Sequence, residues 1–200
     1  MNAATIVNGP KFIAELTASQ GQLRDENLTV NGDAIIVGKE HSLASLCLEG
    51  ITFTGMVLIK KFEKSSPPFQ IRSCNFLGGL GLEHCEGGHL SIMGVAAKWA
   101  HFWHCKFEVA SFREFGVDGS LDISGFQLTE GFSAHGVTFT ELELIHSHTS
   151  KWIHTPFVKT DDPIVACQFR LIGVPVFMST EAVRAGVSTA EGVRSALLTA

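Results

Sequence analysis

The stretch "LDISGFQLTEGFSAHGVTFTELELIH" at residues 121–146 decides the fold, because its apolar residues come in pairs. Members of a pair lie two residues apart, and successive pairs begin five residues apart with one slip of six. The pairs are Leu121/Ile123, Phe126/Leu128, Phe132/Ala134, Val137/Phe139 and Leu142/Leu144. A helix repeats every 3.6 residues and a strand every two, so neither alone gives this pattern. It indicates a backbone built from five-residue units.

The same unit continues backwards through "FGVDG", "ASFRE", "CKFEV" and "AHFWH" to "FQIRS", so it covers residues 69–151. Single-residue slips fall at Gly79, Ser120 and Gly131. The first and third positions of each unit are predicted to face inward. They are apolar throughout, with the exceptions of Gly87, Ser147 and Thr149. Self-similarity at a fixed period over this length is the signature of a repeat architecture.

The geometry of the unit follows from its two inward positions. Alternate residues of an extended segment point the same way, and a turn must then follow before the next pair. Four such short sides close a coil of about twenty residues, and stacked coils pair through backbone hydrogen bonds at about 4.8 Å. We therefore predict an all-β protein, a right-handed and roughly square β-helix whose core is a continuous apolar column.

Outside residues 69–151 the pattern is interrupted. Units "LCLEG", "ITFTG" and "MVLIK" occupy residues 46–60, and "LTVNG" is a weaker unit at residues 28–32. The intervening "KFEKSSPPF" contains two prolines, which cannot donate to a strand ladder, so we predict a loop there. A short amphipathic helix is expected at residues 10–19, and Ser188 with Glu191 has the spacing of a capping box for a C-terminal helix. The predicted organisation is an N-terminal cap at residues 1–27, a solenoid at 28–169, and a helical cap or dimerisation segment at 170–200.

Bulk composition limits the function classes. The chain has 200 residues, 45% of them hydrophobic, and a net charge of −5. The charge argues against direct nucleic-acid binding. No apolar run is long enough to span a membrane, and the first residues do not resemble a secretion signal. We expect a cytoplasmic protein.

The units resemble those of the pentapeptide-repeat proteins, which place a small residue two positions before a central Leu or Phe. Matching pairs here are Cys74/Phe76, Ala100/Phe102, Cys105/Phe107 and Ala110/Phe112. The family usually has Asp or Asn between the two, which only Asn75 and Asp122 provide here; a less regular β-helix is the alternative. The resemblance implies a rod-shaped quadrilateral β-helix. Some members act as DNA mimics that bind type II topoisomerases, and others are bacterial effectors.

Acidic residues gather late in the repeats. Residues 114–150 contain no Lys or Arg, and their acids are Glu114, Asp118, Asp122, Glu130, Glu141 and Glu143. On stacked coils, their density along the axis approaches that of duplex DNA, about one charge per 1.7 Å. Two interpretations stay open: a solvated acidic surface, or a face that docks on a partner as a DNA mimic.

Two tryptophans fall on outward or corner positions. Trp99 and Trp103 belong to adjacent units. An exposed tryptophan pair is a typical interface anchor. The alternative is that the "KFEKSSPPF" loop covers them.

Coil stacking also aligns polar side chains. His101, Asp122 and Glu143 form one predicted outward column, with His84, His104 and His146 at the following corner. Such a column offers metal binding or acid–base chemistry, but a convex rod has no evident pocket. The five cysteines include Cys74, Cys85 and Cys105 at small inward positions, where they are expected to pack as small hydrophobes. We therefore predict neither a cofactor nor a metal.

The prediction for function is a non-enzymatic binding protein that docks its rod surface on a protein partner. The candidate contacts are the six acids with Trp99 and Trp103. The most specific version is a DNA-mimic-like inhibitor of a DNA-handling enzyme, such as a topoisomerase or a nucleic-acid-targeting defence complex. The alternative is a β-helix enzyme or effector module acting on a polymer such as a polysaccharide, with His101, Asp122 and Glu143 as its site.

Overall fold

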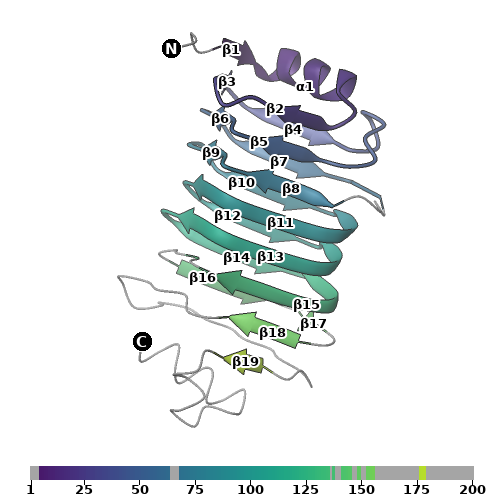
Figure 1. Ribbon diagram of the computed structural model, residues 1–200, viewed down its shortest axis with the longest axis vertical. Coiled ribbons are helices and arrows are strands. Elements are labelled where there is room, and N and C mark those ends of the chain that lie inside the picture. Colours follow the sequence, from purple (N-terminus) through teal and green to yellow (C-terminus); the bar gives the residue numbers. More distant parts are fainter. Residues whose placement is uncertain are drawn as a thin grey trace.

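The protein is a β-solenoid, and the part of the chain that the structure describes includes a short helix at its N-terminal end (Figure 1). The structure, a computed structural model, describes residues 5–63, 68–135, 137, 141–145, 148–149, 152–155 and 176–178, with side chains in 5–63, 68–129 and 137. The strands within these residues form a 13-stranded and a 6-stranded sheet, and their pairings are parallel, as in β10 (Leu80–Glu83) with β12 (Ala100–Trp103). The predicted β-helix is confirmed.

The elements follow one another coil by coil. The helix is α1 (Gly9–Ala18), and the strands are β1 (Thr5–Asn8), β2 (Gln22–Arg24), β3 (Leu28–Asn31), β4 (Ala34–Val37), β5 (Cys47–Glu49), β6 (Thr52–Phe53), β7 (Val57–Lys60), β8 (Phe69–Arg72), β9 (Asn75–Phe76), β10 (Leu80–Glu83), β11 (Glu86–Ala97), β12 (Ala100–Trp103), β13 (Lys106–Val117), β14 (Ser120–Ser124), β15 (Gln127–His135), β16 (Glu141–Ile145), β17 (His148–Thr149), β18 (Trp152–Thr155) and β19 (Val176–Met178).

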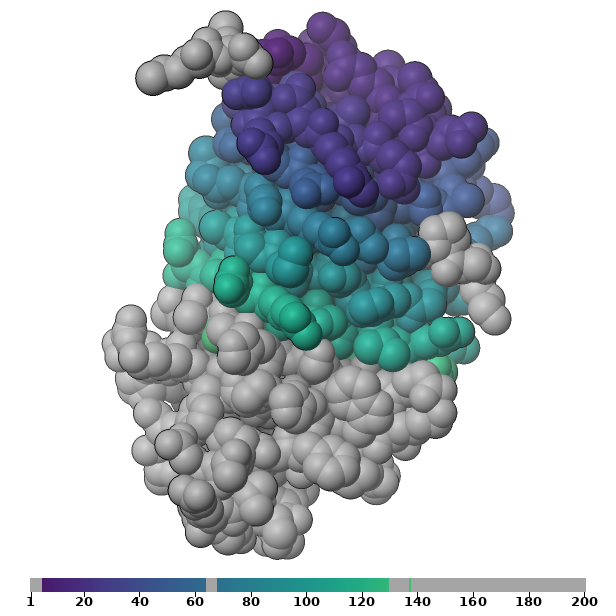
Figure 2. All heavy atoms as spheres, viewed as in Figure 1, coloured from purple at the N-terminus to yellow at the C-terminus, as the bar shows by residue number. Residues whose placement is uncertain are grey.

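One side of the solenoid is the 6-stranded sheet, in the order β16-β14-β12-β10-β7-β4. The 13-stranded sheet continues around the other sides, because β11 and β13 are each 12 residues long and bend at corners. Gly94 and Glu114 occupy equivalent corner positions with φ of 62° and 50°, a left-handed conformation that turns the chain. Figure 2 shows the coils as successive bands of surface from the purple N-terminal coil to the teal coils.

The length of a coil changes along the rod. Leu80 pairs with Ala100, twenty residues on, and Ala100 with Leu121, twenty-one residues on. These spacings agree with the predicted period. Nearer the N-terminus Val57 pairs with Leu80, twenty-three residues on. The sequence pattern did not indicate these longer coils.

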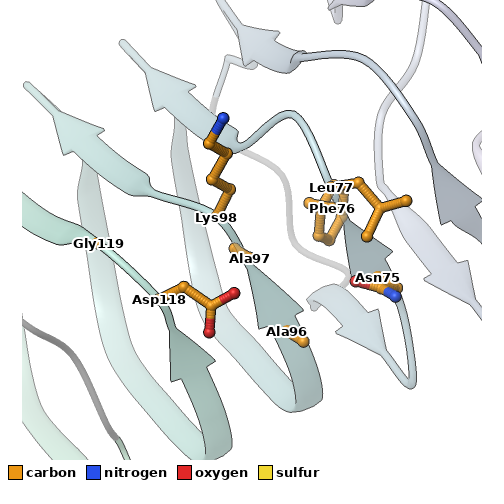
Figure 3. A pocket seen from close by; sticks show the side chains of 8 residues that line it. All are labelled: Asn75, Phe76, Leu77, Ala96, Ala97, Lys98, Asp118 and Gly119. Carbon is orange, nitrogen blue, oxygen red and sulfur yellow. The ribbon is translucent and has the colours of Figure 1, made fainter.

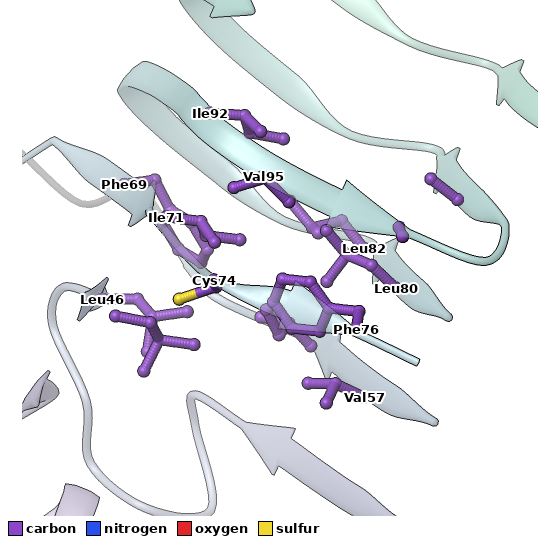
Figure 4. Packing of buried hydrophobic residues seen from close by; sticks show 14 of the residues in the cluster. Leu46, Val57, Phe69, Ile71, Cys74, Phe76, Leu80, Leu82, Ile92 and Val95 are labelled. Carbon is purple, nitrogen blue, oxygen red and sulfur yellow. The ribbon is translucent and has the colours of Figure 1, made fainter. Parts of the chain in front are cut away.

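The inward positions form one apolar column. Every predicted inward position from Phe69 to Leu128 is buried except Gly87. Figure 4 shows Phe69, Cys74 and Phe76 from one coil packed among residues of the coils on either side. The Phe53 and Phe76 rings stack 5.0 Å apart at 2°. Burial raises the pKa of the Cys74 thiol to about 11, as expected for a cysteine that acts as a core hydrophobe.

Two segments of the N-terminal half differ from the predicted pattern. In "MVLIK" the buried residues are Val57 and Ile59, so the prediction that Met56 and Leu58 face inward was wrong by one residue. The longer corner at Gly55 and Met56 moves the strand start to Val57. Strand β4 was not predicted.

Helix α1 covers the first coil, close to the prediction of residues 10–19. Asn8 is its N-cap, whose side chain accepts a hydrogen bond from the Lys11 backbone N–H at 3.0 Å. Phe12 and Leu16 are fully buried, and Phe12 packs edge-on against Phe53 at 5.2 Å.

The predicted C-terminal helix, including Ser188 and Glu191, lies outside the described residues, as does any dimer contact there. In the described part, β19 pairs with β18.

Candidate functional site

Three aromatic side chains form a row on the outer face of the 6-stranded sheet. Trp99 directly precedes β12, and His101 and Trp103 follow at alternate positions, while Ala100 and Phe102 between them are buried. The His101 ring stacks on Trp99 at 5.3 Å and 13° and on Trp103 at 4.2 Å and 19°. We call Trp99, His101 and Trp103 the aromatic row.

Glycines on the neighbouring strand make room for the row. A Cβ atom at Gly79 would clash with the indole of Trp99, and one at Gly81 would clash with Nε2 of His101. The rings therefore extend across β10, and Gly81 is buried beneath them. Gly79 also has a φ of 111°, which L side chains rarely adopt. These glycines fix how closely the rings approach the sheet.

Carboxylates flank the row on both sides. On β14, Asp122 accepts a hydrogen bond from Trp103, with 2.6 Å between Nε1 and Oδ2. On β10, Oε1 of Glu83 lies 3.3 Å from Nε2 of His101, without the alignment of a hydrogen bond. Nε2 of His101 and Oδ1 of Asp122 are buried and have no hydrogen-bond partner. A hydrogen bond thus holds Trp103 at the end of the row, whereas the imidazole of His101 at its centre has a buried nitrogen without a hydrogen-bond partner.

His101 is neutral at neutral pH. Burial lowers the pKa of its imidazole below the ordinary value, and the opposing attraction of Glu83 and Asp122 is the smaller effect. The row therefore carries no positive charge of its own between the two carboxylates.

The two tryptophans differ in exposure. Trp103 is 39% exposed, whereas Trp99 is half-buried over Gly79 and beside His101. The expectation of an exposed pair is correct for Trp103 alone. In the described part of the "KFEKSSPPF" loop, no side-chain hydrogen bond, ion pair or ring stacking joins it to either indole, and its Glu63 pairs instead with Lys39 at 3.0 Å.

The six acids do not lie on one side of the rod. Glu114 is exposed at a corner inside β13, and Asp118 is exposed after the end of that strand. Asp122 is half-buried on the 6-stranded sheet. Glu130 lies in β15 of the other sheet, while Glu141 and Glu143 lie in β16 beside β14. Asp122, Glu141 and Glu143 lie on the 6-stranded sheet, whereas Glu114 and Glu130 lie in strands of the 13-stranded sheet, because five-residue units carry successive acids around corners.

The predicted polar column is present in the backbone register. His101 pairs with Asp122, and Asp122 with Glu143. At the next corner the exposed rings of His84 and His104 stack at 5.3 Å. Among the described residues there is no group of three or more His, Cys, Asp or Glu side chains that could hold a metal ion. His146 lies outside the described residues.

A shallow open hollow of about 410 Å³ lies at the corner before the aromatic row. Figure 3 shows Leu77, Lys98 and Asp118 around it, from three successive coils. Its floor consists largely of apolar and small residues, including Ala97 and Gly119. The hollow is not lined by the His101 column, so it gives that column no pocket.

Sequence reasoning missed Glu83 and the two glycines as parts of the site. The spacing of twenty residues between Gly79 and Trp99 was the available signal. Within the described residues, no helix has the length and apolar character needed to cross a membrane. Comparison of the chain with protein-family models, with curated proteins and with solved structures finds no match.

Proposed function

We propose that this protein is a non-enzymatic binding protein that docks the outer face of its 6-stranded sheet on a protein partner, with Trp103 as the anchor. The observation that carries the proposal is the exposure of Trp103, 39%, at the end of a stacked row. Tryptophan is enriched among the residues that contribute most to protein–protein binding.

The anchor is held in place before any partner arrives. One face of the Trp103 indole is against His101, and its N–H is bonded to Asp122. Ordering a mobile side chain on binding costs about 0.5–1.5 kcal/mol. Trp103 avoids much of that cost, which favours a binding role over incidental exposure.

Two more specific functions have less support. A DNA mimic needs its acids on one side of the rod. Glu114 and Asp118 instead lie at corners, outside the 6-stranded sheet that carries Asp122. A polysaccharide-cleaving site at His101 and Asp122 needs accessible groups, whereas both faces of the imidazole are stacked and Oδ2 is bonded to Trp103. The coils of twenty and twenty-one residues support the resemblance to pentapeptide-repeat proteins, which we keep as part of the proposal.

The test is a pull-down from bacterial lysate with matched variants. Trp103→Ala removes the anchor, and Met93→Ala is the control, since Met93 is 38% exposed on a strand of the other sheet. We expect one set of proteins to be retained by the wild type and by Met93→Ala but lost with Trp103→Ala. Retention should fall less steeply with salt than binding through exposed acids would, because salt screens an apolar contact and a half-buried carboxylate less than it screens exposed charges.

The contrary result is retention that does not depend on Trp103, or no retained protein. Circular dichroism of both variants checks that they remain folded. Retention lost at high salt and with Asp118→Lys, but unaffected by Trp103→Ala, would instead favour the acidic mimic.

A further inference from the structure

We propose that the partner's contact group is an arginine, whose guanidinium stacks on the open face of Trp103 beside the Asp122 carboxylate. This inference rests on the proposed function and names the chemistry of the partner. The observations that carry it are an unstacked ring face, a carboxylate fixed at the ring edge, and the shape of the row.

Trp103 is partly open to solvent, with 39% of its surface exposed. In the described part of the chain, the aromatic ring stacked on Trp103 is that of His101, at 4.2 Å. Strand β12 ends at Trp103, and His104 then turns the corner with a φ of 51°. The row Trp99, His101 and Trp103 thus ends in an exposed ring, on which one more flat group can continue the stack.

The charge around this ring favours a cation. The indole N–H donates to Asp122 at 2.6 Å, which places a negative charge at the edge of the ring and enriches its π-electrons. Glu83 adds a second carboxylate on the opposite flank of the row. His101, whose pKa is lowered by burial, does not offset the charge of Asp122. In the backbone register Lys60 is the neighbour of Glu83 and not of Asp122, so the charge beside the Trp103 ring is chiefly that of Asp122. Cations bind over tryptophan faces in such settings.

The shape of the row selects arginine over lysine. Its rings are parallel plates, inclined by 13° and 19° to one another. Guanidinium is planar and weakly hydrated, so it stacks on an aromatic face. The charge of Asp122 attracts it without a direct hydrogen bond, because Oδ1 is buried and Oδ2 is bonded to Trp103. An ammonium is compact and strongly hydrated. An uncharged sugar ring would use the indole face but gain nothing from the charge of Asp122.

The experiment measures fluorescence anisotropy of labelled peptides that alternate glycine with arginine, lysine or citrulline. We expect the wild-type protein to bind the arginine peptide at least about fivefold more tightly than the lysine peptide, and citrulline not detectably. Trp103→Ala and Asp122→Asn should each remove the preference for arginine. Trp103→Phe should keep part of it, and Met93→Ala all of it.

Equal binding of the arginine and lysine peptides, or a preference that survives Trp103→Ala, would overturn the inference, because simple charge attraction would then suffice. So would absence of peptide binding, or binding of oligosaccharides from a glycan array in place of peptides. If retention in the pull-down depends on Trp103 but the arginine peptide does not bind, the proposed docking is supported and the proposed arginine contact is wrong. If the arginine peptide binds but no protein is retained through Trp103, the arginine site is supported and the proposed docking on a protein partner is wrong.

Discussion

At the residue scale, His101 shows how burial and charge compete at one side chain. Two indoles cover its faces, and Nε2 is buried without a hydrogen-bond partner. Desolvation disfavours the imidazolium, while Glu83 and Asp122 favour it. Desolvation is the larger effect, so the folded protein holds a proton at His101 less well than the unfolded chain does.

A pH dependence of stability follows with a definite sign. The pKa of His101 in the folded state is below its unfolded value of about 6.5. Above pH 6.5 both states are neutral and stability is complete. As the pH falls through 6.5, the unfolded chain takes up the proton first and the free energy of unfolding decreases, levelling off below the folded pKa. Burial lowers the pKa of His89 as well, so both histidines act in this direction.

Urea unfolding followed between about pH 8 and pH 5 measures this effect. We expect His101→Gln to flatten part of the decrease seen with the wild type. Ser91→Ala, an uncharged change on the other sheet, is the control and should keep the full decrease. A His101→Gln variant with an unchanged profile would show that the imidazole does not carry the effect.

The sequence predicted the register of this site better than its contacts. His101, Asp122 and Glu143 were placed in one column from the coil length alone, and their backbones pair as expected. The bond from Trp103 to Asp122 depends on side-chain rotamers, which periodicity does not specify. The sequence pattern did not show that the six acids lie on several sides of the rod. Each corner turns the chain to another side, so residues near in sequence face different directions.

At the element scale, strands with two large inward residues were predictable and strands with irregular corners were not. The five-residue pattern holds from β8 through β14, where each side begins directly after a short turn. It failed at β7, where the extra corner residue Met56 shifts the pattern by one. Strand β4 was missed because "AIIV" is a short apolar run, whose periodicity alone does not distinguish helix from strand.

The cap helix α1 makes a prediction at this scale. Phe12 is fully buried against Phe53 at the open end of the core, so Phe12→Ala should lower the free energy of unfolding by about 3–5 kcal/mol. Asn8→Ala removes the N-cap bond and should cost about 1 kcal/mol. Ala14→Gln, on the exposed face of the same helix, should stay within about 0.5 kcal/mol.

Urea denaturation monitored by circular dichroism gives all three values. A cost below about 1 kcal/mol for Phe12→Ala would mean that the first coil does not need its cap, contrary to the general requirement that solenoid ends be covered.

At the scale of the whole molecule, the fold depends on the register of the inward side chains and not on the number of residues in a coil. Coils of twenty, twenty-one and twenty-three residues stack in one rod, and the differences are absorbed at corners such as the one at Gly55 and Met56. The sides cannot vary in this way, because a one-residue slip turns every inward side chain outward. Each coil contacts only its neighbours, so the stability of the rod is close to a sum over coils and interfaces.

A deletion and an insertion test this in opposite directions. Removing residues 80–99 joins Gly79 to Ala100, which already occupies the position of Leu80 one coil on. We expect this shorter chain to fold and unfold cooperatively, with a lower free energy of unfolding because one coil interface is lost.

Inserting one alanine between His101 and Phe102 adds a single residue but forces either Ala100 or Phe102 out of the core. We expect that chain to lose its cooperative transition, whereas one alanine inserted at the corner between Gly119 and Ser120 should be tolerated. Circular dichroism melts of the three chains decide the matter: if the single residue inside a strand is tolerated and the missing coil is not, length rather than register controls the fold.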